Sequence, residues 1–213
     1  MTILTYRFRL KLSILLRFIL LVLVTCSMSI MSPQVFAQDL ERREARVQAT
    51  YLTHLINFTR WRQDHLPSKG IAPKILVIGS DRNGFVASLK YLISQSNLEI
   101  GGVASKLTHL NNASSGNLLA KLKKGMQVVF LMPDSSLDVT TVRELSPSAV
   151  IFGFGREFVT KMGGDVSFVS SRNRVKLVLS VEYFRRTSPK LSAKIANLKS
   201  VVEIIRKPRK TSE

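Results

Sequence analysis

The sequence predicts a single three-layer α/β domain, in which a mostly parallel sheet carries helices on both faces and ends in a C-terminal β-hairpin plus helix. Short continuous apolar runs at residues 75–78, 128–131 and 149–152 indicate strands that are buried on both faces. Helical patterns separate these runs, which favours parallel pairing. Residues 161–181 alternate apolar and polar side chains on both sides of a short polar turn, which predicts the hairpin.

Residues 1–37 are predicted to form a secretory signal peptide. Basic residues precede an uncharged apolar run at 18–31, and Ala37 closes a stretch that fits a cleavage site. The run is shorter than the about 20 residues that a bilayer-spanning helix needs. A retained anchor, lengthened by the preceding apolar residues, is the alternative. Cleavage would leave one domain over residues 38–205, followed by a basic tail over 206–213.

The cysteine content and the charge limit the class of partner. Cys26 is the only cysteine, so the exported chain would contain no thiol and no disulfide. The residues before Cys26 distantly resemble a lipoprotein box, and lipidation there is an alternative to cleavage after Ala37. The formal net charge is +18. A strongly basic exported domain suits anionic lipid head groups, cell-wall polymers or an acidic protein face, unless the charge is only a solvated surface. Export argues against nucleic acid as a partner.

The first half of the chain is predicted to contain a long helix and a βα unit. Apolar side chains recur at helical spacing over residues 39–62, with the polar residues facing away and Trp61 closing the core. After the strand at 75–78, residues 79–84 turn the chain into a second helix. The glycine spacing of this turn is similar to that of a phosphate-binding loop. Phe85 stands where such a loop needs lysine, so no triphosphate site is predicted.

Weaker elements follow in the second half. A strand is predicted over residues 100–104, and a short helix ends at residues 123–125, where glycine follows two lysines. Residues 133–136 are expected to cap the next helix, over 137–145. The last helical pattern runs from about residue 189 to 205 and is expected to cover the sheet, with the hairpin at one edge.

Ligands of parallel α/β sheets gather beyond the carboxyl ends of the strands. Polar side chains follow three of the predicted strands at that position, and four of them are candidate ligand contacts: Ser80, Asp81, Ser135 and Arg156. The alternative is that these turns only reverse the chain.

No residue pattern typical of catalysis or metal binding occurs in the sequence. The three histidines have no ligand spacing with other donor residues. The carboxylates Asp81, Asp134, Asp165 and Glu182 lie near predicted strand or helix ends, where capping explains them as well as a functional role does. We therefore expect no metal, no cofactor and no enzyme activity. An enzyme that acts on an anionic cell-wall polymer is the alternative, and only the charge favours it.

Three stretches of the sequence contain recognisable motifs. The first is the helix segment 48–61, with an A-x-Y-L…F…W pattern, and the second is the strand and turn at 75–79. The third and most specific is the G-F…G-G…V-x-F…R-V-K-L run at 153–177, continued at 189–192. Together these stretches resemble the YfiR-like periplasmic family, and the resemblance covers nearly all of the chain after the predicted signal peptide.

This resemblance implies a non-enzymatic periplasmic regulator of an inner-membrane signalling protein. The best-known member binds the periplasmic part of a membrane-bound diguanylate cyclase and keeps it inactive, which implies a role in cyclic-di-GMP signalling and biofilm formation. The alternative is a small-ligand sensor subunit associated with a histidine kinase or a transporter. A homodimer is also compatible with the sequence. At the hairpin turn, Arg172, Asn173 and Arg174 are the candidate contacts for a partner.

The chain departs from the family pattern at three points. Arg62 stands where a proline often follows the tryptophan, and Ser180 stands where asparagine is usual. The cysteines that form disulfides in the best-known member are missing. If those disulfides tune that member to the redox state of the envelope, this chain cannot respond in the same way.

Overall fold

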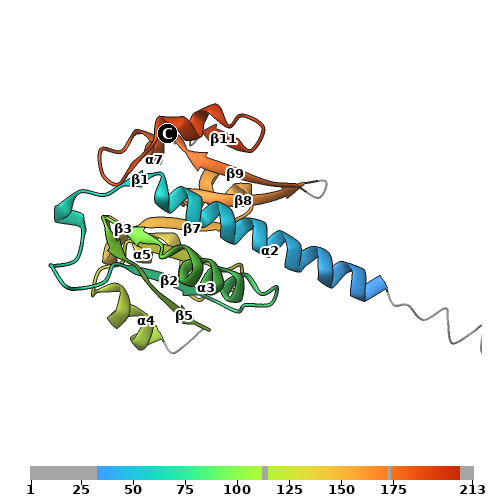
Figure 1. The fold of residues 1–213 in the computed structure, drawn as a ribbon, viewed down its shortest axis with the longest axis horizontal. Helices are drawn as coiled ribbons and strands as arrows, with labels where there is room; N and C mark the ends of the chain where they lie inside the picture. Colours follow the sequence, from blue (N-terminus) through green and yellow to red (C-terminus); the bar gives the residue numbers. More distant parts are fainter. Residues whose placement is uncertain (1–32, 112–114, 172–173, 207–213) are drawn as a thin grey trace, which may run out of the picture. The chain divides into compact units, whose positions relative to one another are not determined.

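A computed structural model describes residues 33–111, 115–171 and 174–206 (Figure 1). Most of the predicted signal peptide and most of the basic tail lie outside these residues. The chain divides into two units, residues 1–40 and 41–213, and the second unit holds the α/β domain. Helix α2 (Pro33–Asn57) begins in the first unit and continues into the second.

Helices and strands alternate along the domain. The helices after α2 are α3 (Phe85–Ser96), α4 (Ser115–Leu122), α5 (Val139–Leu145), α6 (Arg156–Thr160) and α7 (Val181–Arg185), with 3₁₀ turns η1 (Gln63–His65) and η2 (Ala193–Asn197). The strands of the main sheet are β2 (Lys74–Ile78), β5 (Lys106–Leu110), β6 (Val128–Leu131), β7 (Val150–Phe154), β8 (Val166–Ser171), β9 (Arg174–Ser180) and β11 (Val202–Ile205). Two small sheets pair β1 (Thr59–Arg60) with β10 (Lys190–Leu191) and β3 (Glu99–Ile100) with β4 (Val103–Ala104).

Within the described residues, the main sheet has seven strands in the order β11-β9-β8-β7-β6-β2-β5. All neighbouring strands are parallel except β8 and β9, which form an antiparallel hairpin. The predicted fold class, a mostly parallel sheet with a C-terminal hairpin, is therefore confirmed.

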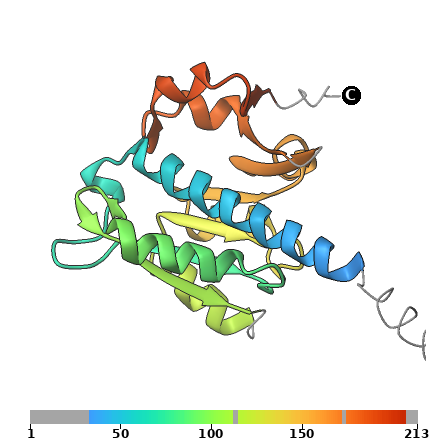
Figure 2. The same cartoon turned by 45° about the vertical axis from the view of Figure 1, so that its right-hand side comes forward.

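The buried strands divide their side chains between two apolar cores, one on each face of the sheet. On β2, Ile75 and Val77 pack in the core with α2 and α3, whereas Leu76 and Ile78 pack in the core with α4 and α5. All four side chains are fully buried, as expected for a strand covered on both sides. Figure 2 shows α2 and α3 lying across one face of the sheet.

The first helix ends earlier than the sequence predicts. α2 stops at Asn57 rather than at residue 62, because Thr59 and Arg60 leave the helix to pair with β10. Trp61 lies just beyond, half-buried against the core as predicted.

The prediction of a sheet strand over residues 100–104 is wrong, and strand β5 is not predicted. Residues 99–104 form a small hairpin around Gly101-Gly102, outside the main sheet. β5 pairs with β2 at the edge of the main sheet. Its sequence, Lys-Leu-Thr-His-Leu, mixes polar and apolar residues because an edge strand is only partly covered. It therefore lacks the continuous apolar run that marks the central strands.

The predicted helix over residues 189–205 is also wrong. The segment contains β10, the short η2 and β11, and β11 pairs in parallel with β9. β11 thus occupies the edge of the sheet that the sequence assigns to the hairpin. Apolar residues from Leu191 to Val202 recur at helical spacing, which explains the error. The β-branched residues of 201–205 instead suit the open edge of β9. The helix that follows the hairpin is the short α7.

Helix α5 is capped by Asp138 rather than by residues 133–136, so that prediction is wrong. The Asp138 carboxylate accepts a hydrogen bond from Thr141 N at 2.7 Å. This bond lowers the pKa of Asp138 below its usual value. Residues 133–136 instead form a turn directly after β6, in which Ser135 N donates to Met132 O.

Candidate functional site

A crevice of about 500 Å³ lies beyond the carboxyl ends of β2, β6 and β7, where ligands of parallel sheets gather. One wall comes from the segments that follow these strands, and the other comes from α2. The lining residues are Glu41, Glu44 and Gln48 of α2, Ser80, Arg82 and Asn83 after β2, Met132, Pro133 and Asp134 after β6, and Phe154 at the end of β7.

A single carboxylate joins the turn after β2 to the turn after β6. Asp134 accepts a hydrogen bond from Ser80 N at 3.0 Å. Hydrogen bonding to Ser80, with a smaller effect of Arg82, lowers the pKa of Asp134. Gly79 lies next to this contact with φ +112°, and a Cβ there would come within 2.5 Å of Met132 Cβ. The close approach of the two strand ends therefore requires glycine.

The α2 wall of the crevice contains a buried amide. Gln48 is 1 % exposed, and its Nε2 donates to Glu44 Oε1 at 2.8 Å. Ser170 of β8 also donates to Glu44. The Gln48 Oε1 atom is buried and has no hydrogen-bond partner among the described residues. A buried acceptor without a donor costs about 1–3 kcal/mol, so this atom lowers the stability of the α2 wall.

The crevice is acidic although the chain as a whole is basic. Glu41, Glu44 and Asp134 bring carboxylates to it, and Arg82 brings one guanidinium. Its described lining contains no histidine, cysteine or lysine. Across residues 33–111, 115–171 and 174–206, no group of three or more His, Cys, Asp or Glu side chains could hold a metal ion. The arrangement can bind a small polar ligand through hydrogen bonds and ion pairs.

Two of the predicted ligand contacts lie in the turn after β2. Ser80 lines the crevice, and its hydroxyl donates to Asn111 at 3.0 Å. Asp81 caps α3, since its carboxylate accepts hydrogen bonds from Val86 N at 3.0 Å and Ala87 N at 3.4 Å. The structure therefore brings Ser80, but not Asp81, to the crevice lining.

The other two predicted ligand contacts bond to protein groups. The Ser135 hydroxyl bonds to the backbone N–H and carbonyl of Leu137 within the turn after β6. Arg156 forms a two-pronged ion pair with Glu203 of β11, with one of its bonds at 2.7 Å. Glu203 raises the pKa of Arg156, and Arg156 lowers the pKa of Glu203. Neither residue is part of the crevice lining.

Sequence reasoning missed the α2 wall, because polar residues of an amphipathic helix are expected to face solvent. Glu44 and Gln48 are instead covered by the hairpin and the sheet. The only local signal is their spacing of four residues, which places them on the same helical face.

The predicted partner contacts lie at the hairpin tip. Arg174 begins β9 and is exposed. Arg172 and Asn173 lie outside the described residues. The bond from Ser170 to Glu44 places the neighbouring part of β8 beside α2, so the hairpin borders the crevice.

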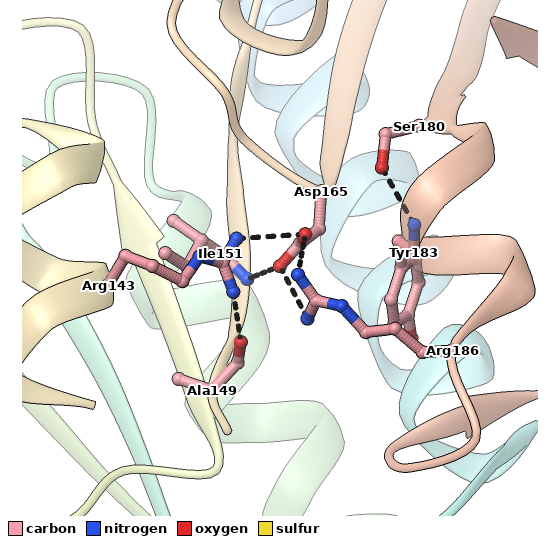
Figure 3. A network of polar contacts seen from close by, with 7 residues as sticks. All are labelled: Arg143, Ala149, Ile151, Asp165, Ser180, Tyr183 and Arg186. Carbon is pink, nitrogen blue, oxygen red and sulfur yellow. Dashed lines mark hydrogen bonds and ion pairs between the residues drawn. The ribbon is translucent and has the colours of Figure 1, made fainter. Parts of the chain in front are cut away.

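A buried ionic network surrounds Asp165, which directly precedes β8 (Figure 3). It lies at the end of the sheet where the parallel strands begin, opposite the crevice. Asp165 is 2 % exposed. Its Oδ1 accepts hydrogen bonds from Arg143 Nη2 at 2.9 Å and Arg186 Nη2 at 2.8 Å, and its Oδ2 accepts one from Ile151 N at 2.9 Å. The network ties α5, β7 and the segment after α7 together. The partners of Asp165 lie 22, 21 and 14 residues away in the sequence, so no local signal indicates the network.

The start of α7 accounts for one departure from the family pattern. The Ser180 hydroxyl accepts a hydrogen bond from Tyr183 N at 3.0 Å and caps the helix. Serine and asparagine are similarly good N-caps, so serine preserves the cap. Tyr183 is fully buried, and its hydroxyl bonds to Thr59 Oγ1 at 3.1 Å. Burial raises the pKa of Tyr183 above its usual value.

Comparison with known proteins identifies the family. In the part of the chain that the structure describes, no helix is long and apolar enough to cross a membrane. No match is found among curated proteins. The family described as YfiR/HmsC-like (DUF4154) matches residues 45–199, which include the crevice turns, the hairpin and the Asp165 network. The resemblance predicted from the sequence is thus confirmed, and the chain belongs to the YfiR/HmsC-like family.

Proposed function

We propose that the protein is a non-enzymatic periplasmic regulator that binds and represses the periplasmic domain of an inner-membrane signalling protein, a diguanylate cyclase. The observation that carries the proposal is the family match over residues 45–199. The predicted signal peptide supports a periplasmic location, and the family supports a binding role rather than catalysis.

Repression would follow from differential affinity. A regulator can shift the equilibrium between the active and inactive states of its partner only by the difference in its binding free energy for the two states. Moving the partner from almost fully active to almost fully inactive would need a preference of about 10⁴-fold. An extended surface is better suited to this than a few contacts, and the hairpin beside α2 is our candidate for its centre, with Arg172, Asn173 and Arg174 as contacts.

The proposal is tested by deleting the gene and measuring cyclic-di-GMP and biofilm formation. Deletion is expected to raise both quantities, and reintroducing the wild-type gene is expected to lower them to their original levels. Pull-down from envelope extracts should recover an inner-membrane signalling protein. Unchanged cyclic-di-GMP together with the absence of such a partner would refute the proposal.

Charge reversal at the hairpin locates the interface. Arg174→Glu is expected to weaken repression without changing the unfolding midpoint, because the side chain is exposed. The matched control is Arg185→Glu, another exposed arginine, on α7. Equal repression by the two variants would move the interface away from the hairpin.

A second candidate function is that of a small-ligand sensor subunit associated with a histidine kinase or a transporter. The crevice, with its carboxylates and its guanidinium, favours it. Of the contacts predicted from sequence, Ser80 is the one that we retain at the ligand, together with Arg82 and Asp134. A thermal-shift screen with nucleotides, amino acids and cell-wall fragments tests it, since a ligand at a hundred times its dissociation constant stabilises by about 2.7 kcal/mol. Melting curves that none of these compounds moves would count against it.

A further inference from the structure

Five lysines lie at the end of the sheet where the parallel strands begin, opposite the crevice. Lys74 and Lys106 open β2 and β5 and face each other in the strand register, so their side chains leave the same face of the sheet. On that face, Lys74 Nζ donates to Lys124 O at 3.3 Å, just after the end of α4. We call this group the lysine patch: Lys74, Lys106, Lys121, Lys123 and Lys124.

The lysine patch lacks counter-charges. None of its members takes part in an ion pair within the described residues. Between Asp81 and Asp134 the sequence contains one acidic residue, Glu99. Like charges that the fold holds together repel one another, so an anionic surface placed against the patch would be attracted by all of them.

Two exposed aliphatic side chains border the lysine patch. Ile71 is 49 % exposed and Val103 is 43 % exposed. Together with Lys69 they line a shallow pocket of about 350 Å³ between the loop before β2 and the β3–β4 hairpin. The loop is joined to the patch because Lys106 N donates to Pro73 O at 2.8 Å. Figure 1 shows this loop and the β3–β4 hairpin on the same side of the domain.

We propose that this edge of the domain docks on the surface of an anionic lipid bilayer. Each lysine close to such a surface contributes about 1 kcal/mol, or roughly fivefold in affinity. The exposed Ile71 and Val103 would enter the headgroup region, as apolar side chains of peripheral membrane proteins do.

The composition of the patch favours a bilayer over a protein partner. Protein interfaces are enriched in arginine and aromatic residues and depleted in lysine. The segments that carry or border the lysine patch, residues 66–74, 100–106 and 116–126, contain neither arginine nor an aromatic residue. Flexible, strongly hydrated lysine side chains suit a fluid layer of phosphates, which does not demand fixed geometry.

Docking by this edge would orient the domain. The lysine patch lies where β2 and β5 begin, and the crevice lies where β2, β6 and β7 end. A domain that rests on the bilayer through the patch therefore presents the crevice away from the membrane. The inference requires only export across the inner membrane, and it holds whether or not the protein represses a diguanylate cyclase.

The test uses the protein isolated from the periplasmic fraction and flotation with two kinds of vesicle. One kind is an equimolar mixture of phosphatidylglycerol and phosphatidylcholine, and the other is phosphatidylcholine alone. The wild-type protein is expected to bind the mixed vesicles only. Binding should weaken as salt rises, because the Debye length falls from about 8 Å at 0.15 M to about 3 Å at 1 M.

Two triple variants with the same loss of charge separate the patch from the net charge. Lys106→Gln, Lys123→Gln and Lys124→Gln together should lower the partition coefficient roughly tenfold to a hundredfold. The control triple, Lys90→Gln, Lys176→Gln and Lys194→Gln, removes exposed lysines outside the patch and should change it little. Ile71→Ser is expected to lower binding a few-fold at every salt concentration.

Three outcomes would overturn the proposal. They are no binding of the wild-type protein to mixed vesicles, equal binding to both kinds of vesicle, or equal losses in the two triple variants. Urea unfolding of each variant checks the fold. If the patch triple unfolds early, the pair Lys123→Gln and Lys124→Gln, which follows the end of α4, replaces it and should still bind at least about fivefold more weakly than the wild type.

Discussion

Replacing Asp165 by alanine is expected to lower the free energy of unfolding by about 3 kcal/mol. Breaking a buried ion pair by removing one partner costs about 3–5 kcal/mol, and the substitution also leaves the Ile151 N–H without its acceptor. The Arg143 and Arg186 side chains are 27 % and 25 % exposed. Water can therefore replace part of what they lose, which places the expected cost at the lower end of that range.

The assay is urea unfolding at neutral pH, followed by the fluorescence of Trp61, the only tryptophan. Trp61 packs against the core, so its emission reports loss of the fold. For a domain of this size, about 3 kcal/mol corresponds to a fall in Tm of roughly 6–12 °C. Asp165→Asn keeps one acceptor oxygen and is expected to lose less, about 2 kcal/mol.

The matched control is Glu157→Ala, which breaks the exposed ion pair with Lys161. The two side chains are 70 % and 68 % exposed, so the expected change is below about 0.5 kcal/mol. If Asp165→Ala cost no more than this control, the network would not hold the C-terminal segment to the sheet, and the reasoning would be refuted.

Three further predictions concern single side chains, each measured by urea unfolding. Gly79→Ala should lower the free energy of unfolding by at least about 2 kcal/mol, because it adds backbone strain and a clash with Met132. The control is Gly70→Ala, where φ is +87° and no atom lies within 4 Å, so that only the backbone strain is added. Equal losses of stability in the two variants would contradict the clash with Met132. Burial raises the pKa of Tyr183, so its contribution to stability is complete below its unfolded pKa of about 10 and declines as pH rises above that value. Tyr183→Phe should therefore reduce the fall of the free energy of unfolding with pH above about 10. An unchanged slope in this pH range would contradict the contribution of Tyr183. Gln48→Met removes the unpartnered Oε1 together with the hydrogen bond from Nε2 to Glu44, and these opposing effects should change the free energy of unfolding by less than about 1 kcal/mol. A loss well above the about 0.5–1.5 kcal/mol of one hydrogen bond would contradict the absence of a partner for Oε1.

The sequence alone determined the central part of the fold. The runs at 75–78, 128–131 and 149–152 are strands in the structure because a strand covered on both faces must be apolar throughout, and that constraint is visible in one dimension. The hairpin is visible for a similar reason, since β8 and β9 are adjacent in the chain. The family could also be assigned from the sequence, because its motifs keep their order and spacing.

Only the tertiary structure decided the edges of the sheet and the contents of the crevice. β5 and β11 pair with strands that lie 32 and 25 residues earlier in the chain. Edge strands carry mixed polarity that does not distinguish them from loops or helices. The α2 wall of the crevice, the Asp165 network and the lysine patch likewise join residues from separate elements. A sequence pattern reports which residues prefer burial, whereas the choice of partner depends on which element the completed fold brings alongside. Gln48 and Asp165 have no distinctive local sequence, and they are buried because the fold places other elements against them, at opposite ends of the parallel strands.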